Sequence, residues 1–409
     1  MVVSTKKIWV IFLTLIASYS VKIPFLNAPI YRVIFPLLAI SLLLSKNNQI
    51  KKQKLMQKSG QITWICWAVI IIWGSFLAVA HNTVSYSVDY LMWDVCFVCV
   101  FFCYSIYFAR DDFAKTCLGT FFAFSAAIGL SGIYESATGR LYHETHVAYR
   151  AYKNALGLVR PNTIFFNVND SAVFMSMALI LAFLFAEYCN NGNRIKIIAL
   201  VIFGGNVLLT ESRGAIVGVM LFIYIYFMHT LAPKKKFVYV LAAIPILVSF
   251  VPFLWELVYT SDVNFSELGG RGTVWRNSLS SLIHSNFLGN GPGNTVIFNS
   301  AYTGVAAVHN WFLEIICDYG LIGGISLFIW YIKLIIISHG FCKKKGKKTH
   351  SMIVVYAGLI GFIFLSISSS SLIGKIWPIC FFGILIAEIN KTERLNSFGM
   401  PFIIKLLFC

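Results

Sequence analysis

Long apolar stretches recur along the whole of this sequence and are separated by short polar segments rich in Lys and Arg. A helix needs about 20 mostly apolar residues to cross about 30 Å of hydrocarbon, and within lipid it satisfies its own backbone hydrogen bonds. The pattern therefore predicts an all-α polytopic membrane protein with about twelve transmembrane helices. We place them near residues 8–20, a second stretch ending near 44, 62–80, 89–109, 116–133, 171–185, 197–210, 215–228, 237–255, 321–338, 352–369 and 377–389.

Basic residues give the orientation of these spans. Lysines crowd residues 46–58, 234–236 and 343–348, and such loops stay on the cytoplasmic side of a membrane. The alternation then puts both termini in the cytoplasm. The run after Lys6 and Lys7 is expected to be the first span, since no small-residue cleavage site follows it. With no internal repeat in view, residues 1–409 are expected to form one integral membrane domain.

The sizeable polar segments fall on the opposite, extracytoplasmic face. A smaller loop is expected over residues 134–170, and a large loop over residues 256–320 between the ninth and tenth helices. The short turn 211–214 joins them on that side. A transporter generally carries polar groups at mid-membrane, where Asp94 is the clearest case here. Polar chemistry collected at one face favours an enzyme working at the membrane surface.

Composition excludes other classes of protein. The 409 residues are 58% hydrophobic and only 12% charged, too little polar surface for a soluble globule. The net charge of +17 is mostly the cytoplasmic excess of Lys and Arg, so a nucleic-acid partner is not expected. Most of the ten cysteines lie in apolar runs, without the paired spacing of a disulfide framework or a metal site. Neither a metal nor another cofactor is predicted.

Three arginines near the outer face are candidates for binding an anion. Arg213 opens the eighth predicted span, and Arg271 and Arg276 lie in the large loop. A guanidinium binds phosphate oxygens with a bidentate fork, and a helix N-terminus adds favourable backbone N–H groups. Two or three such arginines would form a clamp for a diphosphate. The alternative is that they only contact lipid headgroups.

His309 is the candidate general base. A neutral imidazole can accept a proton from a hydroxyl near neutral pH, and His309 begins a predicted helix that continues through Trp311. The alternatives are a helix cap or a satisfied core histidine. Glu314 and Asp318 are four residues apart on one face of that helix, where they either orient the imidazole or only solvate the helix.

Several motifs, taken in order, resemble the superfamily of O-antigen ligases and polymerases, which are integral membrane enzymes of bacterial envelopes. They are Ser-Arg-Gly-Ala at 212–215, Gly-Arg-Gly-Thr-Val-Trp at 270–275, Asn-Phe-Leu-Gly-Asn-Gly-Pro-Gly-Asn at 286–294, His-Asn at 309–310 and Tyr-Gly-Leu-Ile-Gly at 319–323. The resemblance covers roughly residues 165–340. Outside that range only the hydrophobic pattern is similar.

The resemblance implies a metal-independent, inverting, GT-C-like glycosyltransferase of the bacterial cytoplasmic (inner) membrane. Its donor would be a glycan on undecaprenyl diphosphate and its acceptor a glycan or lipid-linked molecule. Arg213 and Arg271 would hold the diphosphate, His309 would deprotonate the acceptor hydroxyl, and Arg276 is an additional basic residue. Membrane lipids, a flippase and a chain-length regulator are the other implied partners.

We therefore expect a polymerase that joins repeat units of a surface polysaccharide such as O-antigen, capsule or exopolysaccharide. The Asn-Val-Asn-Asp sequence at 167–170 resembles capsule and exopolysaccharide polymerases more than ligases. Alternatives are an O-antigen ligase that transfers the finished lipopolysaccharide glycan to lipid A-core or another acceptor, and a polysaccharide transporter or flippase.

Overall fold

The protein is described by a computed structural model that places most of the chain. The described residues are 22–23, 28–44, 57–108, 110–140, 154, 156–165, 167–231, 271–303, 308–343, 349–369 and 371–398. Within these ranges the fold is helical, apart from an antiparallel pair of two-residue strands, β1 (Lys22–Ile23) and β2 (Ala28–Pro29).

Among the described residues, eight helices are long and apolar enough to cross a membrane. They are α4 (Lys58–Ala80), α5 (Val84–Tyr107), α6 (Asp111–Thr138), α7 (Val168–Ala186), the continuous run of α8 (Gly192–Ala199), η1 (Leu200–Gly204) and α9 (Gly205–Thr210), α10 (Arg213–Thr230), α14 (Trp311–Cys342) and α15 (Thr349–Ser368). Two further apolar helices are α2 (Tyr31–Leu44) and α16 (Ile376–Phe398). The predicted class, a polytopic helical membrane protein, is thereby confirmed.

The predicted spans correspond closely to these helices. Each of ten overlaps a described helix, whereas the spans at 8–20 and 237–255 lie outside the described residues. The total of twelve therefore stays a prediction. α6 continues to Thr138, into the segment expected as the smaller loop, because Gly139 ends it only there, with φ +73° and its N–H bonded to Glu135 O.

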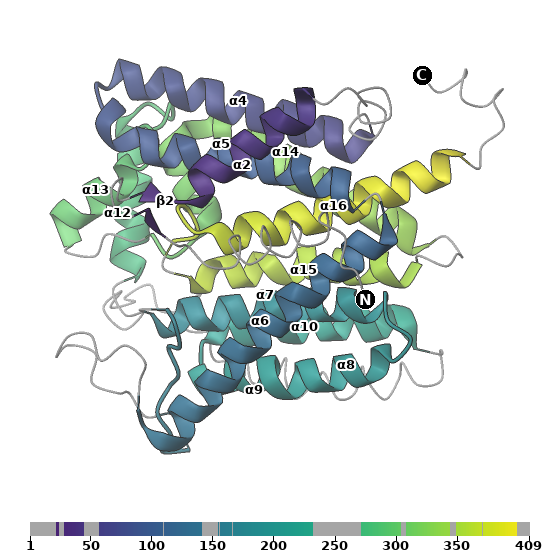
Figure 1. The fold of residues 1–409 in the computed structure, drawn as a ribbon. Coiled ribbons are helices and arrows are strands. Elements are labelled where there is room, and N and C mark those ends of the chain that lie inside the picture. Colours follow the sequence, from purple (N-terminus) through teal and green to yellow (C-terminus); the bar gives the residue numbers. More distant parts are fainter. Residues whose placement is uncertain are drawn as a thin grey trace.

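The long helices run side by side, with α4 at one edge and the α8–α9 helix at the other (Figure 1). α4 packs on α14, α5 on α16 and α10 on α15, while α7 is buried along nearly its whole length. Between α4, α5 and α14 the rings of Trp67, Phe97 and Trp330 meet at centroid distances of 4.1 to 5.7 Å. The interior is thus aromatic.

Glycines let α10 and α15 approach closely. A Cβ on Gly218 would lie 2.8 Å from Gly361 O, and one on Gly361 would lie 2.7 Å from Gly218 O. A Cβ on Gly214, four residues before Gly218, would lie only 2.4 Å from Ser368 Oγ. Small residues at this spacing are how helices pack backbone to backbone in membranes. The contact fixes the start of α10 against the end of α15.

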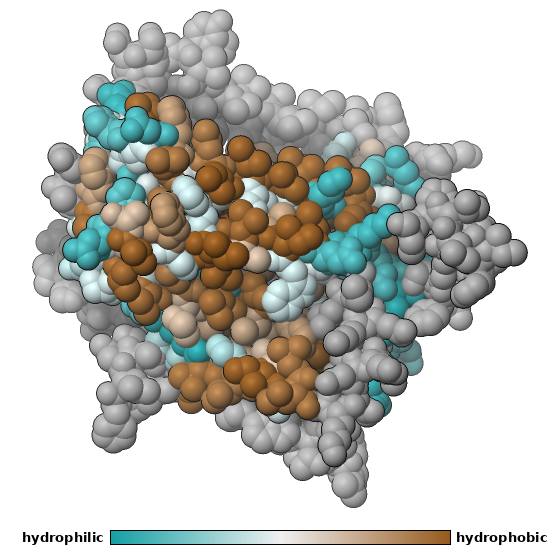
Figure 2. Space-filling model, turned by 90° about the horizontal axis from the view of Figure 1, so that it is seen from above, coloured by the Kyte–Doolittle hydropathy of each residue, from teal (hydrophilic) through white to brown (hydrophobic). Residues whose placement is uncertain are grey.

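The outer surface carries an apolar belt. Figure 2 shows hydrophobic residues across the middle of one face and hydrophilic residues toward its two ends. Large exposed apolar side chains include Ile72 and Val79 of α4 and Ile325 and Ile336 of α14. A soluble monomer rarely exposes so much contiguous apolar surface, and lipid tails are its natural surroundings.

Two short helices, α12 (Arg271–His284) and α13 (Asn294–Thr303), lie at one end of the bundle beside β2 (Figure 1). They form the described part of the predicted large loop, and residues 256–270 lie outside the described ranges. The following helix α14 is broken at Gly320, which has φ +63° and ψ −164°. This break falls next to residue 321, where the tenth span was predicted to begin.

Candidate functional site

Arg213 is the first residue of α10 and its side chain is exposed. The preceding residue, Ser212, is the N-cap and is buried, and its Oγ donates to Asn169 Oδ1 at 3.0 Å. Asn169 belongs to the first turn of α7. The arginine therefore lies beside the N–H groups at the start of α10, an end that Ser212 ties to α7. The guanidinium and these N–H groups both favour the binding of an anion.

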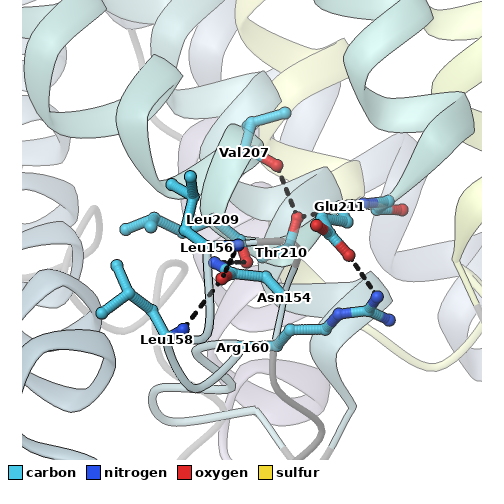
Figure 3. A network of polar contacts seen from close by, with 9 residues as sticks. Asn154, Leu156, Leu158, Arg160, Val207, Leu209, Thr210 and Glu211 are labelled. Carbon is cyan, nitrogen blue, oxygen red and sulfur yellow. Dashed lines mark hydrogen bonds and ion pairs between the residues drawn. The ribbon is translucent and has the colours of Figure 1, made fainter.

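Glu211 is next to this arginine and is paired. It takes a left-handed backbone conformation, with φ +51°, between α9 and α10, and its carboxylate binds the guanidinium of Arg160 (Figure 3). Asn154 holds the loop that carries Arg160, since its Oδ1 accepts from the N–H groups of Leu156 and Leu158, each at 3.0 Å. Arg160 is a basic residue near the start of α10 that the sequence analysis did not single out.

The other two arginines lie on α12. Arg271 is its first residue, and its side chain lies outside the described part of the structure. Arg276 is exposed. Trp275, between them, donates its Nε1–H to Val308 O at 2.7 Å. This hydrogen bond ties α12 to the residue that precedes His309.

His309 stands just ahead of α14 in a left-handed conformation, with φ +56°. It is half-buried, between the buried Val308 and the helix. The capping side chain belongs to Asn310, whose Oδ1 accepts from Leu313 N at 3.2 Å. A positive φ is uncommon for a residue other than glycine and costs on the order of 1 kcal/mol or more, so the surroundings must hold the backbone of His309 there.

Glu314 and Asp318 are fully buried, at 0% exposure, which excludes the alternative that they only solvate the helix. Asp318 accepts from Gly293 N at 2.8 Å and from Thr295 N at 3.0 Å. It thus holds the glycine-rich turn at residues 287–294 and the start of α13. Glu314 accepts from Ser371 Oγ at 2.8 and 2.9 Å.

The glycine-rich turn closes on α14 itself. A Cβ on Gly289 would lie 2.4 Å from Gly320 N, and one on Gly320 would lie 2.2 Å from Leu288 O. Asn290 N donates to Cys317 O at 3.0 Å and Leu321 N to Phe287 O at 2.9 Å. The backbone of this turn therefore lies directly against the break in α14.

A lysine that the sequence analysis did not single out lies in the loop between α15 and α16. Lys375 Nζ lies 2.7 Å from Asp170 Oδ2 in the first turn of α7. Ser369 Oγ donates to Asp170 Oδ1, also at 2.7 Å. Burial lowers the pKa of the Lys375 ammonium, and the nearby Asp170 carboxylate opposes that shift.

These contacts bring several predicted residues to one end of the bundle. Ser212, the residue before Arg213, binds Asn169 of α7. The next residue of α7, Asp170, binds Lys375 in the loop between α15 and α16. Ser371 of that loop binds Glu314 in α14. On the other side Trp275 links α12 to Val308. The starts of α7, α10 and α14 are thus connected, and α12 lies against the last of them. The contact between Asp170 and Lys375 could not be predicted from the sequence, because it depends on how three helices pack together.

Within the ranges that the structure describes, no group of three or more His, Cys, Asp and Glu could hold a metal ion. His143 and His146 lie outside those ranges. The basic residues described at this end of the bundle carry guanidinium and ammonium groups, which can neutralise phosphate charge directly.

Comparison with known proteins agrees with the motifs. Residues 198–328 match the family model described as O-antigen ligase. The chain resembles the O-antigen ligases and polymerases. It is also 27% identical over 265 residues to the teichuronic acid biosynthesis protein TuaE of Bacillus subtilis (strain 168). That alignment covers 59% of this chain and spans about half of the relative, 54% of its length.

The family match includes every predicted site residue. Arg213, Arg271, Arg276, His309, Glu314 and Asp318 all lie within residues 198–328. Arg160, Asp170 and Lys375 lie outside it.

Proposed function

We propose that this protein is a glycosyltransferase of surface-polysaccharide biosynthesis that acts at the outer face of the bacterial cytoplasmic membrane. The observation that carries the proposal is the family match over residues 198–328, which contains both the α10 start with Arg213 and the α14 start with His309. In the structure these two helix starts are joined through Asn169, Asp170, Lys375 and Ser371.

The proposed reaction is transfer of a glycan from undecaprenyl diphosphate. The acceptor hydroxyl attacks the anomeric carbon from the side opposite the diphosphate, and the bond to the diphosphate oxygen breaks with inversion. His309 takes the hydroxyl proton, and the leaving diphosphate keeps the electron pair. Arg213 and Arg271, with Arg276 as a further cation, stabilise the charge that develops there, each contact contributing about 3 kcal/mol. No metal is needed in this scheme.

We favour a polymerase, in which the acceptor is the next lipid-linked repeat unit. The curated relative is named for the biosynthesis of a polysaccharide, teichuronic acid. The second candidate is a ligase that transfers the finished glycan to lipid A-core or another acceptor, and the description of the family model favours it. A transporter gains no support from Asp94, because this buried carboxylate accepts a hydrogen bond from Tyr319.

A single assay separates these candidates. The purified protein in lipid is incubated with one synthetic repeat unit on undecaprenyl diphosphate, and the products are separated by size. We expect a ladder of multiples. If the substrate stays unchanged until a final acceptor is added and is then consumed, the protein is a ligase instead. No transfer under either condition would contradict the proposed function.

The proposed base has its own test. His309→Ala should reduce transfer by about 100-fold or more, since general-base catalysis typically contributes 10² to 10⁴. His284, an exposed histidine at the end of α12, provides the matched control, and His284→Ala should keep full activity. Initial rates are measured at equal amounts of inserted protein. A fully active His309→Ala protein would exclude this residue as the base.

A further inference from the structure

The loop between α15 and α16 contacts several helices at one end of the bundle. The structure describes residues 369 and 371–375 of this loop. Its backbone accepts hydrogen bonds at Gly374 O from Tyr31 Oη, at 3.0 Å, and at Lys375 O from Trp93 Nε1, at 2.8 Å. Its side chains bind Asp170 and Glu314. It therefore contacts α2, α5, α7 and α14, in addition to the two helices that it joins.

The charged groups that meet at this loop are mostly buried. The side chains of Lys375 and Asp170 are 24% and 10% exposed, and Glu314 is 0% exposed. The Lys375 ammonium pairs with the Asp170 carboxylate and donates to Ser369 Oγ at 3.3 Å. Ser369 Oγ lies 3.3 Å from Ser371 O, and the Ser371 hydroxyl binds the Glu314 carboxylate. Charged groups are rarely buried without partners, and such a polar network holds its members in one arrangement.

The network lies between the two halves of the proposed site. Glu314 is in the first turn of α14, directly after His309 and Asn310. Asp170 is the neighbour of Asn169, which binds the N-cap preceding Arg213. Gly214, next to Arg213, also packs against Ser368, the last residue of α15 before this loop. The separation between the proposed base and the proposed diphosphate-binding arginine is consequently set through these contacts.

We propose that Lys375 is a positioning residue. Together with Asp170, Ser369 and Ser371, it keeps the start of α14, next to His309, in a fixed position relative to the start of α10 at Arg213. This inference rests on the proposed function and names residues beyond those assigned to the chemistry. Lys375 does not touch the reacting atoms in this account. It acts through Asp170 and, by way of Ser369 and Ser371, on Glu314.

The chain offers a matched control on the same helix. Lys196 Nζ lies 2.7 Å from Glu187 Oε1, the same distance as in the Lys375–Asp170 pair, and these side chains are 17% and 18% exposed. Glu187 is the C-cap of α7, and Asp170 lies in its first turn. The two pairs are therefore about 25 Å apart, at opposite ends of one helix. A purely structural ion pair should behave alike at both ends.

The test measures transfer by separating the products by size, with rates normalised to monodisperse protein. It compares Lys375→Met and Asp170→Asn with the control variants Lys196→Met and Glu187→Gln. We expect Lys375→Met to lower kcat by about 10-fold to 100-fold with the donor KM within about threefold, because misplacement by about 1 Å costs rate rather than donor binding. The control pair should leave kcat within about twofold. The double variant Asp170→Asn/Lys375→Met should be no slower than the worse single variant.

Ser371→Ala removes the hydrogen bond to Glu314 without changing a charged residue. It replaces the charge variants in the test if these are not recovered as folded protein. It should lower kcat by about threefold to tenfold, and Lys375→Arg should restore part of the rate lost in Lys375→Met. The proposal is overturned if kcat is unchanged in Lys375→Met or in Ser371→Ala, if Lys196→Met is equally slow, or if only the donor KM rises. An unaltered protein that transfers nothing overturns the proposed function itself.

Discussion

At the scale of single residues, the surroundings of Arg213 depend on a neighbour of opposite charge. Glu211 is two residues before Arg213, and its carboxylate is bound by Arg160 from a loop 51 residues earlier in the chain (Figure 3). An unpaired carboxylate there would repel the anion that the helix start attracts. Arg160 thus supports the electrostatics of the proposed diphosphate site.

This arrangement gives a prediction for donor binding. Arg160→Met should raise the donor KM about fivefold, because a carboxylate about 10 Å from a phosphate contributes on the order of 1 kcal/mol at an effective dielectric constant near 30. Adding Glu211→Gln should restore the KM, since the repelling charge is then gone. Steady-state kinetics with the lipid-linked donor measure both. A double variant as weak as Arg160→Met alone would mean that the arginine binds the donor directly.

The sequence could propose Arg213 and His309 as site residues because each lies in a local motif. It could not identify Arg160 or Lys375, since nothing near them in the chain indicates their partners. Glu211 and Asp170 reach them only through the packing of helices. Glu314 and Asp318 were predicted to share a helix face, yet their binding to Ser371 and to the turn at residues 293–295 depends on loops that hydropathy does not place.

At the scale of elements, hydropathy predicted most helices but not which of them would pair. An apolar run indicates a span, and in lipid the choice of neighbour depends on small residues and local fit. Gly214 and Gly218 carry that information for α10, because their lack of a side chain admits α15. The break of α14 at Gly320 likewise needs a conformation that is nearly confined to glycine.

The glycine contact predicts a difference between two alanine substitutions. Gly218→Ala should lower the free energy of unfolding by about 1–3 kcal/mol, because its Cβ would meet the rigid carbonyl of Gly361. Gly205 has no such neighbour within 4 Å, so Gly205→Ala should be neutral or slightly stabilising. Heating the protein with a thiol-reactive dye measures this, since cysteines such as Cys96 and Cys380 are buried. Equal melting temperatures would contradict the packing argument.

At the scale of the whole molecule, the fold separates its surfaces by environment. Apolar side chains cover the middle of the face seen in Figure 2, and the polar network of Asp170, Glu314 and Lys375 lies at the end of the bundle that carries α12 and α13. The opposite ends of the helices carry the Lys196–Glu187 pair and a second pair between Lys391 and Asp111. The lysine-rich runs predicted to be cytoplasmic adjoin that end in sequence.

That charge distribution predicts the orientation of this molecule in the membrane, which can be measured directly. Leu279 of α12 is 46% exposed and lies on the predicted outer face, while His350 of α15 is exposed beside the lysine-rich run at residues 343–348. A membrane-impermeant maleimide should label Leu279→Cys in intact cells, whereas His350→Cys should react only after permeabilisation. Labelling of the unaltered protein is the background for both. Because lysines keep a loop on the cytoplasmic side, the reverse pattern would place the proposed site inside the cell, where an outer-face transfer cannot occur.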